Sequence, residues 1–329
     1  MRVVVLGATG NVGTSVVRRL CADERIEKVI GVARRPGGLK LAGLEWQKAD
    51  IRTTDLATLF GGADVVVHLA WIIQPSHLPE VLRSVNVEGT RRVLDSVGRA
   101  RVPALVHASS VGAYAPGPKD AAADENWPAT GVSTSSYAQH KAQVERDLDA
   151  FEREHPDVRV VRLRPGLTFK RSAANEIRRY FLGHIVPTRL IHPRMVPFIP
   201  EVPRLRFQVV HTDDVADAYV RAVTRDASGA FNVATDPILD PAELGRILGA
   251  APLRVPVRML RMLIWSSWRA RLQPTSEGWL DMALSVPVMS TERICTELGW
   301  RPSRDAASTL LELMEGLRAR SSLPTPALR

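Results

Sequence analysis

The residues with the clearest chemical potential are Tyr137 and Lys141, which stand four positions apart in the stretch STSSYAQHK. On a helix this spacing places both side chains on one face. A phenol with a pKa of about 10 is a poor acid or base at neutral pH, but a neighbouring ammonium group favours its charged form. The pair therefore predicts proton transfer to or from a substrate oxygen.

A serine hydroxyl placed opposite the tyrosine could hold that oxygen during proton transfer. Ser109 and Ser110 directly follow residues 105–108, which are predicted to form a strand. Ligands of parallel α/β sheets bind outside the carboxyl ends of the strands. We therefore expect this serine pair to lie at the same edge of the sheet as Tyr137.

The N-terminal stretch MRVVVLGATGNVG predicts the element that would bring a cofactor to this edge. Residues 3–6 form an apolar run typical of a strand buried on both faces, and a helical periodicity follows at 16, 17 and 20. Gly7, Gly10 and Gly13 between them suit a tight turn, a close approach of the backbone to a pyrophosphate, and helix–strand packing. The phosphates would bind the free amides at the helix start. A loop without a ligand is the alternative. The expected cofactor contacts in this turn are Gly7, Thr9, Gly10, Asn11, Val12 and Gly13.

The end of the second predicted strand, residues 28–33, bears on cofactor choice. A carboxylate at this tip binds the ribose 2′-hydroxyl of NAD but repels the 2′-phosphate of NADP. Ala33 occupies the usual acidic place and Arg34 follows it. We expect NADP in preference to NAD, with Arg34 on the phosphate. In the alternative, Arg34 and Arg35 point to solvent and NAD is bound through other contacts.

Further cofactor contacts are expected at the next strand ends. After a third strand at 44–48, Asp50 could accept from the adenine amino group while Ile51 packs on the ring; alternatively, Asp50 caps a helix beginning near Thr53. A fourth strand at 63–70 contains His68, expected to be structural. The predicted contacts are completed by Leu69, Ala70 and Pro165, together with Tyr137 and Lys141.

Alternating strands and helices predict an α/β fold with a Rossmann-type, doubly wound parallel sheet. We assign residues 1–165 to a dinucleotide-binding domain and 166–329 to a smaller substrate-binding region, with about 207–235 returning to the Rossmann core. Within the second region, the proline-broken residues 167–206 suit a cap over the cleft. Asp213 and Asp214 are expected to cap and anchor a helix.

Motifs along most of the chain resemble those of the extended short-chain dehydrogenases/reductases, the family of NAD(P)-dependent epimerases and dehydratases. There is further likeness to its dihydroflavonol-reductase-type and hydroxysteroid-dehydrogenase-type carbonyl reductases. The matching stretches are GATGNVG, ADI, HLA, NVEGT, HASSVGAY, YAQHK, RLRPG, VVHTDDVADAY, FNVA and ELGWRP.

The resemblance implies roles for individual residues. Ser110 would be the catalytic hydroxyl and Tyr137 the acid–base group, while Lys141 would bind the nicotinamide ribose and lower the tyrosine pKa. Asn86 lies in a stretch predicted to form a helix running to about Arg99, and it would be a supporting residue or, alternatively, a structural amide inside that helix. Arg34 stands where NADP-using members place a phosphate-binding arginine.

Two departures count against a nucleotide-sugar substrate. The segment after Arg164 lacks the asparagine of nucleotide-sugar epimerases, and Phe207 stands where many of them keep a diphosphate-binding arginine, although Arg206 is adjacent. We therefore expect an NAD(P)-dependent oxidoreductase that reduces a carbonyl or oxidises an alcohol on a small, hydrophobic or partly anionic substrate. The alternatives are an epimerase or dehydratase with a retained NAD, and a non-catalytic NAD(P)-sensing protein.

Charge and composition bound the remaining possibilities. The net charge of +9 is concentrated in residues 170–206 and 253–272. A helix within 255–272 would carry apolar residues on one face and arginines on another; core packing is the expected role, with membrane contact as the alternative. Trp265, Trp268 and Trp279 could instead line an apolar pocket. Cys21 and Cys295 have no metal-binding neighbourhood.

We expect a cytoplasmic, metal-free protein with a small-molecule substrate and no nucleic-acid partner. The expectation of no leader or membrane span rests on the strand at residues 3–6 and on the lack of any uninterrupted apolar stretch of spanning length. A homodimer is possible.

Overall fold

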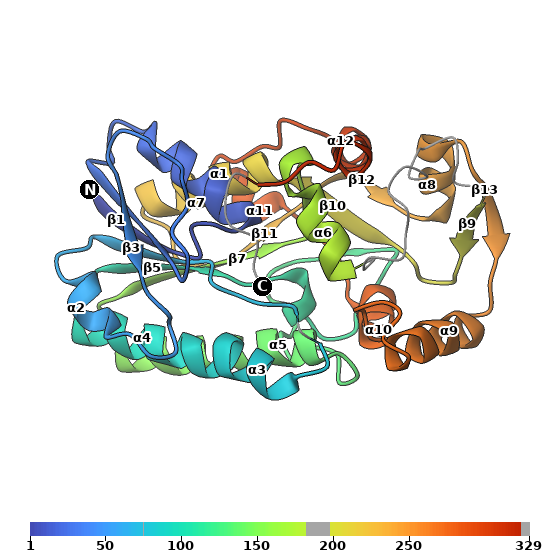
Figure 1. Ribbon diagram of the computed structural model, residues 1–329, viewed down its shortest axis with the longest axis horizontal. Coiled ribbons are helices and arrows are strands. Elements are labelled where there is room, and N and C mark those ends of the chain that lie inside the picture. The colour runs from blue at the N-terminus through green and yellow to red at the C-terminus, as the bar shows by residue number, and fades with distance from the viewer. Residues whose placement is uncertain (75, 182–197, 324–329) are drawn as a thin grey trace.

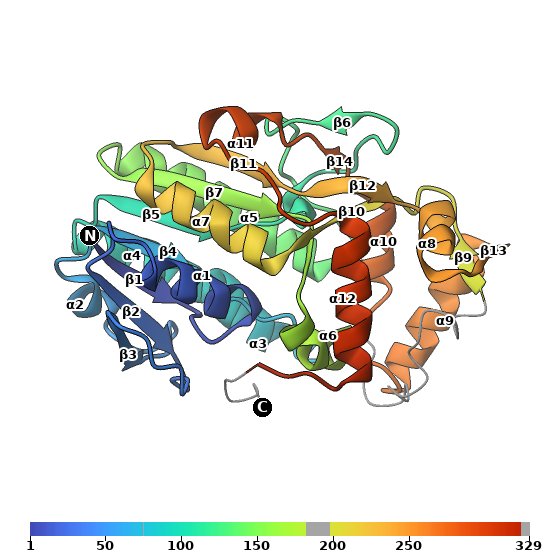
Figure 2. The same ribbon diagram turned by 90° about the horizontal axis from the view of Figure 1, so that it is seen from above.

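The computed structural model describes residues 1–74, 76–181 and 198–323, and its centre is a seven-stranded parallel sheet (Figures 1 and 2). The strand order is β11-β7-β5-β4-β1-β2-β3, which confirms the predicted doubly wound α/β fold. The strands are β1 (Arg2–Leu6), β2 (Lys28–Ala33), β3 (Leu44–Lys48), β4 (Val65–His68), β5 (Ala104–Ala108), β7 (Arg159–Pro165) and β11 (Gly229–Val233).

The apolar run of β1 is explained by helices on both faces of the sheet. Val3 and Val5 pack in one core cluster with residues of α1 (Asn11–Cys21) and α7 (Thr212–Thr224). Val4 and Leu6 pack in the opposite cluster with residues of α2 (Leu56–Phe60), α4 (Gly89–Arg99) and α5 (Ser136–Glu154). All four side chains are fully buried, and each stabilises the fold by about 2 kcal/mol.

Besides α7 and β11, the second half of the chain adds six helices and, together with β6 from the first half, three small sheets within the described residues. The sheets are β8 (Leu167–Phe169) with β10 (Phe207–His211) and β12 (Thr235–Leu239), β9 (Phe198–Glu201) with β13 (Ala251–Arg254), and β6 (Ala122–Ala123) with β14 (Val288–Met289). The helices are α6 (Ala174–Phe181), α8 (Pro241–Leu248), α9 (Val257–Arg269), α10 (Gly278–Ser285), α11 (Glu292–Glu297) and α12 (Ala306–Arg318).

Residues 207–235 divide between the two parts of the molecule. α7 packs beside α1 and β11 forms one edge of the seven-stranded sheet, whereas β10 lies in the three-stranded sheet (Figure 2). Asp214 anchors α7 by accepting from Ser303 Oγ at 2.5 Å and from the Arg304 amide at 3.2 Å, and His211 caps the helix. Asp214 therefore anchors the helix, as expected. The expected capping by the other aspartate is wrong, because His211 is the cap and Asp213 accepts from Ser15 Oγ at 2.7 Å.

Two elements differ from their predicted form. β4 ends at His68, so Leu69 and Ala70 leave the strand and form the cleft wall. The predicted helix around Asn86 consists of α3 (Pro79–Arg83), a π-helical turn at Ser84–Glu88, and then α4. π-helical turns are frequent next to functional sites, and this one contains Asn86.

Across the described ranges, no helix combines the length and apolar character that crossing a bilayer requires. The same part of the chain contains no cluster of three or more His, Cys, Asp or Glu side chains placed to hold a metal ion.

Candidate active site

The glycine turn forms the floor of a cleft at the carboxyl edge of the sheet. Gly7 has a φ of +80°, and a Cβ there would lie 2.7 Å from the Ala70 nitrogen. A Cβ on Gly13 would collide with the Gly7 carbonyl, whereas one on Gly10 would find room. Gly10 precedes α1 with no side-chain cap, and the first turn of α1 contains no acid. These features fit a dinucleotide pyrophosphate, whose charge the helix amides would stabilise.

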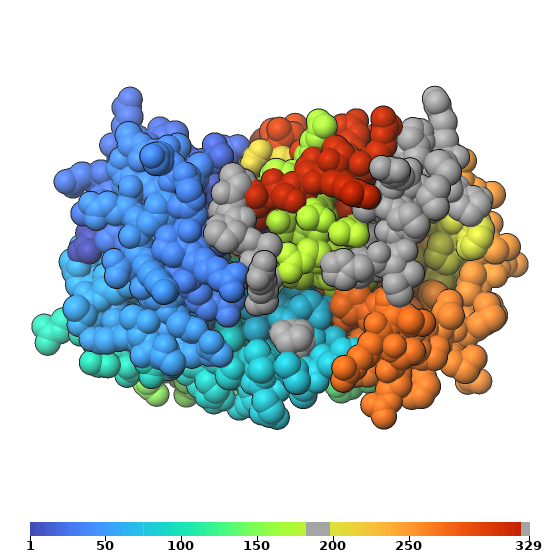
Figure 3. Space-filling view, viewed as in Figure 1, coloured from blue at the N-terminus to red at the C-terminus, as the bar shows by residue number. Residues whose placement is uncertain are grey.

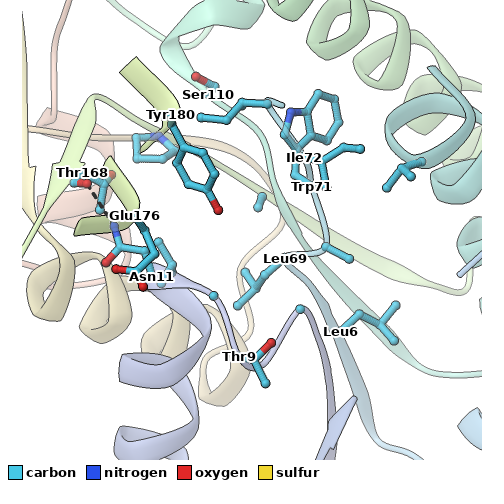
Figure 4. Close-up of a pocket in the computed structure, with 18 of the residues that line it drawn as sticks. Leu6, Thr9, Asn11, Leu69, Trp71, Ile72, Ser110, Thr168, Glu176 and Tyr180 are labelled. Carbon is cyan, nitrogen blue, oxygen red and sulfur yellow. Dashed lines mark hydrogen bonds between the residues drawn. The ribbon is translucent and has the colours of Figure 1, made fainter. Parts of the chain in front are cut away.

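The predicted cofactor contacts all line one cavity of about 390 Å³, except that Gly13 lies behind the turn. Figure 4 shows Thr9, Asn11 and Leu69 around this space. The side-chain amide of Asn11 donates through Nδ2 to the Thr168 carbonyl at 3.1 Å. Ala70 and Pro165 complete the wall. The turn and the ends of β4 and β7 therefore meet at the same edge.

At the end of β2, Arg34 is exposed and lines the cavity, and its charge helps to lower the pKa of Asp50. The main cause of that lowered pKa is Arg52, whose guanidinium lies 2.7 Å from the Asp50 carboxylate. Asp55, and not Asp50, caps α2 through the Ala57 amide. The alternative role of Asp50 as a helix cap is therefore wrong.

The residues expected to carry out proton transfer lie at the start of α5 and just after the end of β5. Lys141 Nζ donates to the Ala108 carbonyl at 2.6 Å, and Tyr137, one turn earlier, bonds the Ser110 hydroxyl. Burial raises the pKa of Tyr137, and the bond from Ser110 opposes that rise. Burial lowers the pKa of Lys141 to about 7, while the charge of Glu145 favours its protonated form.

The two adjacent serines have different partners. Ser109 Oγ donates to Glu145 Oε1 at 2.5 Å. Glu145 also accepts from Arg164 at 2.9 and 3.0 Å and from Arg162 at 2.9 Å. Burial alone would raise the pKa of Glu145, but the bonds and charges of both arginines outweigh it and lower the pKa to about 2. Both serines line the cavity, but the Ser109 hydroxyl is bonded within a buried ionic network, whereas the Ser110 hydroxyl lies beside Tyr137.

Aromatic side chains form the wall beyond the Tyr137 hydroxyl. The Lys141 nitrogen lies 3.4 Å from the ring centroid of Trp71. Trp279 of α10 lies 4.8 Å from the Tyr137 ring and 5.0 Å from the Phe181 ring, centroid to centroid. Figure 4 shows the Tyr180 side chain reaching into the same space. Of the three tryptophans proposed from sequence as pocket residues, Trp279 alone is in this wall.

Asn86 lies behind the wall and does not line the cavity. Its Oδ1 accepts from the Ile72 amide at 2.9 Å, and its Nδ2 donates to the Ile72 carbonyl at 2.7 Å. Both halves of the amide are therefore used to position the segment that carries Trp71. His68 is also structural: its Nε2 lies 3.0 Å from Thr90 Oγ1, and burial lowers its pKa to about 3.

Two charged residues of the cap were not singled out from the sequence. Lys170 Nζ donates to the Asn11 carbonyl at 2.7 Å and to Thr14 Oγ1 at 2.7 Å, so it supports the first turn of α1. Burial lowers the pKa of Lys170 to about 8. Glu176 lines the cavity beside Asn11 (Figure 4), and burial raises its pKa. The sequence showed only that residues 170–206 are basic, and this charge does not indicate where any one side chain of the segment points.

Arg206 is directed away from this cavity. The Arg206 backbone carbonyl accepts from Lys119 Nζ at 2.8 Å. Arg206 lines a separate hollow together with Asp240 and Arg254. Phe207 packs in an apolar cluster with Leu239. Neither Arg206 nor Phe207 lines the cleft, so this part of the described chain supplies no cation there.

A parallel sheet with a glycine turn after its first strand and a Tyr–Lys pair at its carboxyl edge defines a Rossmann-type dinucleotide-binding protein. More narrowly, the chain belongs to the NAD dependent epimerase/dehydratase family, whose model matches residues 3–234. This membership confirms the resemblance found in the sequence motifs.

Individual relatives extend the comparison. The chain is 28% identical over 316 residues to the uncharacterized protein Rv0501 of Mycobacterium tuberculosis, covering 91% of this chain and 80% of that protein. It is 37% identical over 108 residues to the decarboxylating sterol-4-alpha-carboxylate 3-dehydrogenase ERG26 of Candida albicans, covering 32% of this chain and 30% of that enzyme. The UDP-glucose 4-epimerase of Thermotoga maritima superposes with a TM-score of 0.71 at 20% identity, covering 97% and 99% of the two chains.

Proposed function

We propose that this protein is an NADP-preferring oxidoreductase that interconverts an alcohol and its carbonyl compound on a hydrophobic substrate. The observation that carries the proposal is that Tyr137, bonded to Ser110 and one turn from Lys141, faces a wall containing Trp71 and Trp279. A proton-transfer group beside apolar rings suits a substrate that has one reactive oxygen on a hydrophobic body.

The cofactor's part would be hydride exchange with the substrate carbon, which is the chemistry that a nicotinamide supplies. The glycine turn would hold the pyrophosphate, Arg34 the 2′-phosphate, and Lys141 the nicotinamide ribose. In alcohol oxidation Tyr137 takes the hydroxyl proton as the carbon loses hydride; in carbonyl reduction it returns that proton to the oxygen. Ser110 donates a hydrogen bond to the same oxygen, and the charged form of Lys141 favours the phenolate.

The charge of the lining supports a hydrophobic substrate. Among the described lining residues, the cationic side chains are Arg34, Arg35 and Lys141. Arg34 and Lys141 are assigned to the cofactor, and Arg35 directly follows Arg34 at the end of β2. The substrate end has no described cation to receive a diphosphate, whereas Ile72, Val111 and Met282 add to its apolar surface. The similarity to a sterol-4-alpha-carboxylate 3-dehydrogenase supports an alicyclic alcohol or ketone as the substrate class.

A second candidate is an epimerase or dehydratase that oxidises and re-reduces one substrate on a retained NAD. α6 residues and Leu323 border the cleft, and a cofactor beneath them would exchange slowly. Structural neighbours named as nucleotide-sugar epimerases agree with this candidate at the level of fold. We rank this candidate second because the described residues at the substrate end include no cation to bind the diphosphate of a nucleotide sugar.

The test begins with purified protein: it is denatured, and any released nucleotide is identified by mass. Native protein is then titrated with NADPH and NADH and assayed with cyclic hydrophobic ketones and with UDP-sugars, using Tyr137→Phe as the control. An empty site, tighter NADPH binding and ketone turnover lost in the control support the proposal. Stoichiometric bound NAD with UDP-sugar turnover would replace it with the second candidate. NADPH binding without any turnover would point to a sensing protein.

A further inference from the structure

The outward face of α9 exposes an apolar surface that an ordinary solvated helix would not carry. No side chain of this helix is fully buried. The outward residues expose large fractions of their apolar side chains: Met259 53%, Met262 64%, Leu263 64% and Trp265 48%. Contiguous exposed apolar side chains of this size mark an interaction surface. We call these four residues the α9 outer face.

The helix is held firmly on its inner side, so the exposure does not come from a detached end. Trp268 Nε1 donates to Ser76 Oγ at 2.9 Å, and its ring stacks on His77 at 4.4 Å between centroids. Arg261 donates to the Asp281 carboxylate of α10 at 3.0 Å. The predicted apolar stripe faces the protein, as expected, but the opposite side is apolar as well as basic.

Arginines surround the outer face. Arg258, Arg269 and Arg271 are exposed, and residues 251–272 contain no acid. A two-fold contact between two copies would bring these like charges together, because a self-complementary interface pairs a patch with itself. A surface of negatively charged lipid headgroups over hydrocarbon would match both the arginines and the apolar side chains.

We propose that the α9 outer face docks the protein on an anionic lipid surface, with the apolar side chains in the headgroup boundary and the arginines on the phosphates. Tryptophan is well suited to that boundary, because its ring is apolar and its N–H is polar. The helix lies on the surface without crossing it.

Hydrogen bonds connect the segment that follows this helix to the candidate active site. Gln74 Nε2 donates to the Tyr180 carbonyl at 2.9 Å and to the Pro274 carbonyl at 3.0 Å. Thr275 Oγ1 donates to the Phe181 carbonyl at 2.8 Å. In Figure 3 the orange surface of this region adjoins the green surface of α6 and the cyan surface near residue 80. Docking would therefore bring the apolar cavity wall close to the membrane, where hydrophobic substrates partition.

The experiment measures co-sedimentation of the full chain with vesicles of phosphatidylcholine alone and with about 30% phosphatidylglycerol. We expect about tenfold more bound protein on the anionic vesicles, and release at about 0.5 M salt, because screening weakens the arginine contacts. Absence of binding to the anionic vesicles would overturn the proposal. The readout is independent of turnover, so its failure and that of the proposed enzyme activity are distinguishable.

Paired variants locate the contact. Met262→Ser with Leu263→Ser should reduce the bound fraction about tenfold, while Leu311→Ser, an exposed leucine of α12, should leave it unchanged. Arg258→Glu with Arg269→Glu should abolish binding, with Arg318→Glu on α12 as its control. Unchanged melting temperature and NADPH affinity establish that each variant is folded.

Two outcomes would overturn the assignment even if vesicles are bound. One is wild-type binding by both α9 double variants. The other is a dimer by light scattering that Met262→Ser with Leu263→Ser converts to a monomer, because a second copy would then cover the outer face.

Discussion

The ammonium nitrogen of Lys141 lies 3.4 Å from the ring centroid of Trp71 and donates at the same time to the carbonyl of Ala108. The indole covers the ammonium group, and Asn86 holds that cover by bonding the backbone of Ile72. Burial under the ring lowers the pKa of Lys141 to about 7, so this lysine changes charge near neutral pH. A cation–π contact of this kind favours the charged form, but desolvation outweighs it here.

Titration of Lys141 should be visible in cofactor affinity. We expect NADPH to bind more tightly as the pH falls through about 7, because protonated Lys141 is a better partner for the ribose and phosphates. NADPH affinity should be measured at a series of pH values on both sides of 7. In Lys141→Met the change in affinity near pH 7 should disappear. Lys119 is the matched control: burial lowers its pKa to about 7 as well, but it bonds the Arg206 and Ala283 carbonyls away from the cavity. Persistence of this change in affinity in Lys141→Met would contradict the assignment.

Replacing Tyr137 by Phe should lower kcat by about a thousandfold, because Tyr137 is the group that exchanges a proton with the substrate oxygen in the proposed reaction. NADPH affinity, measured by fluorescence titration, should change less than about twofold. The melting temperature is the control for folding. Turnover equal to wild type would refute the role given to Tyr137.

The adjacent serines allow a separation of chemistry from stability. Ser110→Ala should lower kcat about a hundredfold, since Ser110 bonds Tyr137 at the cleft. It should lower the unfolding free energy by only about 1 kcal/mol, through loss of the bond that Ser110 Oγ accepts from the Gly112 amide. Ser109→Ala should destabilise the fold by about 1–3 kcal/mol, because Glu145 loses a buried donor, and should leave kcat near wild type. Steady-state kinetics and urea unfolding of both variants test the pair. The reverse pattern would exchange the two assignments.

The ionic network predicts a pH dependence of stability. Glu145 has a pKa lowered to about 2 from an ordinary value of 4.5, so its stabilising contribution is complete above about pH 4.5 and is lost as the pH falls toward 2. Glu145→Gln should destabilise the protein by about 3 kcal/mol at neutral pH, because Arg162 and Arg164 lose their buried partner. Urea midpoints between pH 2 and 5 should fall less steeply in the variant than in wild type. Equal slopes would count against the network as the cause.

Cofactor choice is tested at Arg34. Arg34→Ala should weaken NADPH binding about tenfold by removing one charge-assisted phosphate contact, while NADH binding should remain unchanged. The NADH titration is the internal control, because NADH lacks the 2′-phosphate. An equal loss for both nucleotides would mean that the arginine acts on the shared part of the cofactor.

Local features of the site could be predicted from the sequence because they depend on short spacings. The four-residue separation of Tyr137 and Lys141 places them on one helix face in any context, and the glycine turn follows from a strand, three glycines and a helix. The order of alternating elements was likewise enough to predict the parallel sheet. Boundaries were less secure: β4 ends at His68 although the apolar run continues to Ala70.

Other features depend on contacts between residues far apart in the chain, and only the tertiary structure decided them. The two serines that follow β5 are adjacent in the sequence, and only the packed structure showed that Ser109 bonds the buried Glu145. The contact of Trp71 with Lys141 depends on the packed structure, and so does the position of Glu176 in the cleft. Neither can be predicted from the spacing of residues along the chain. The same is true of α9: its sequence specified an amphipathic helix, but which apolar side chains remain exposed depended on the surface against which the helix packs.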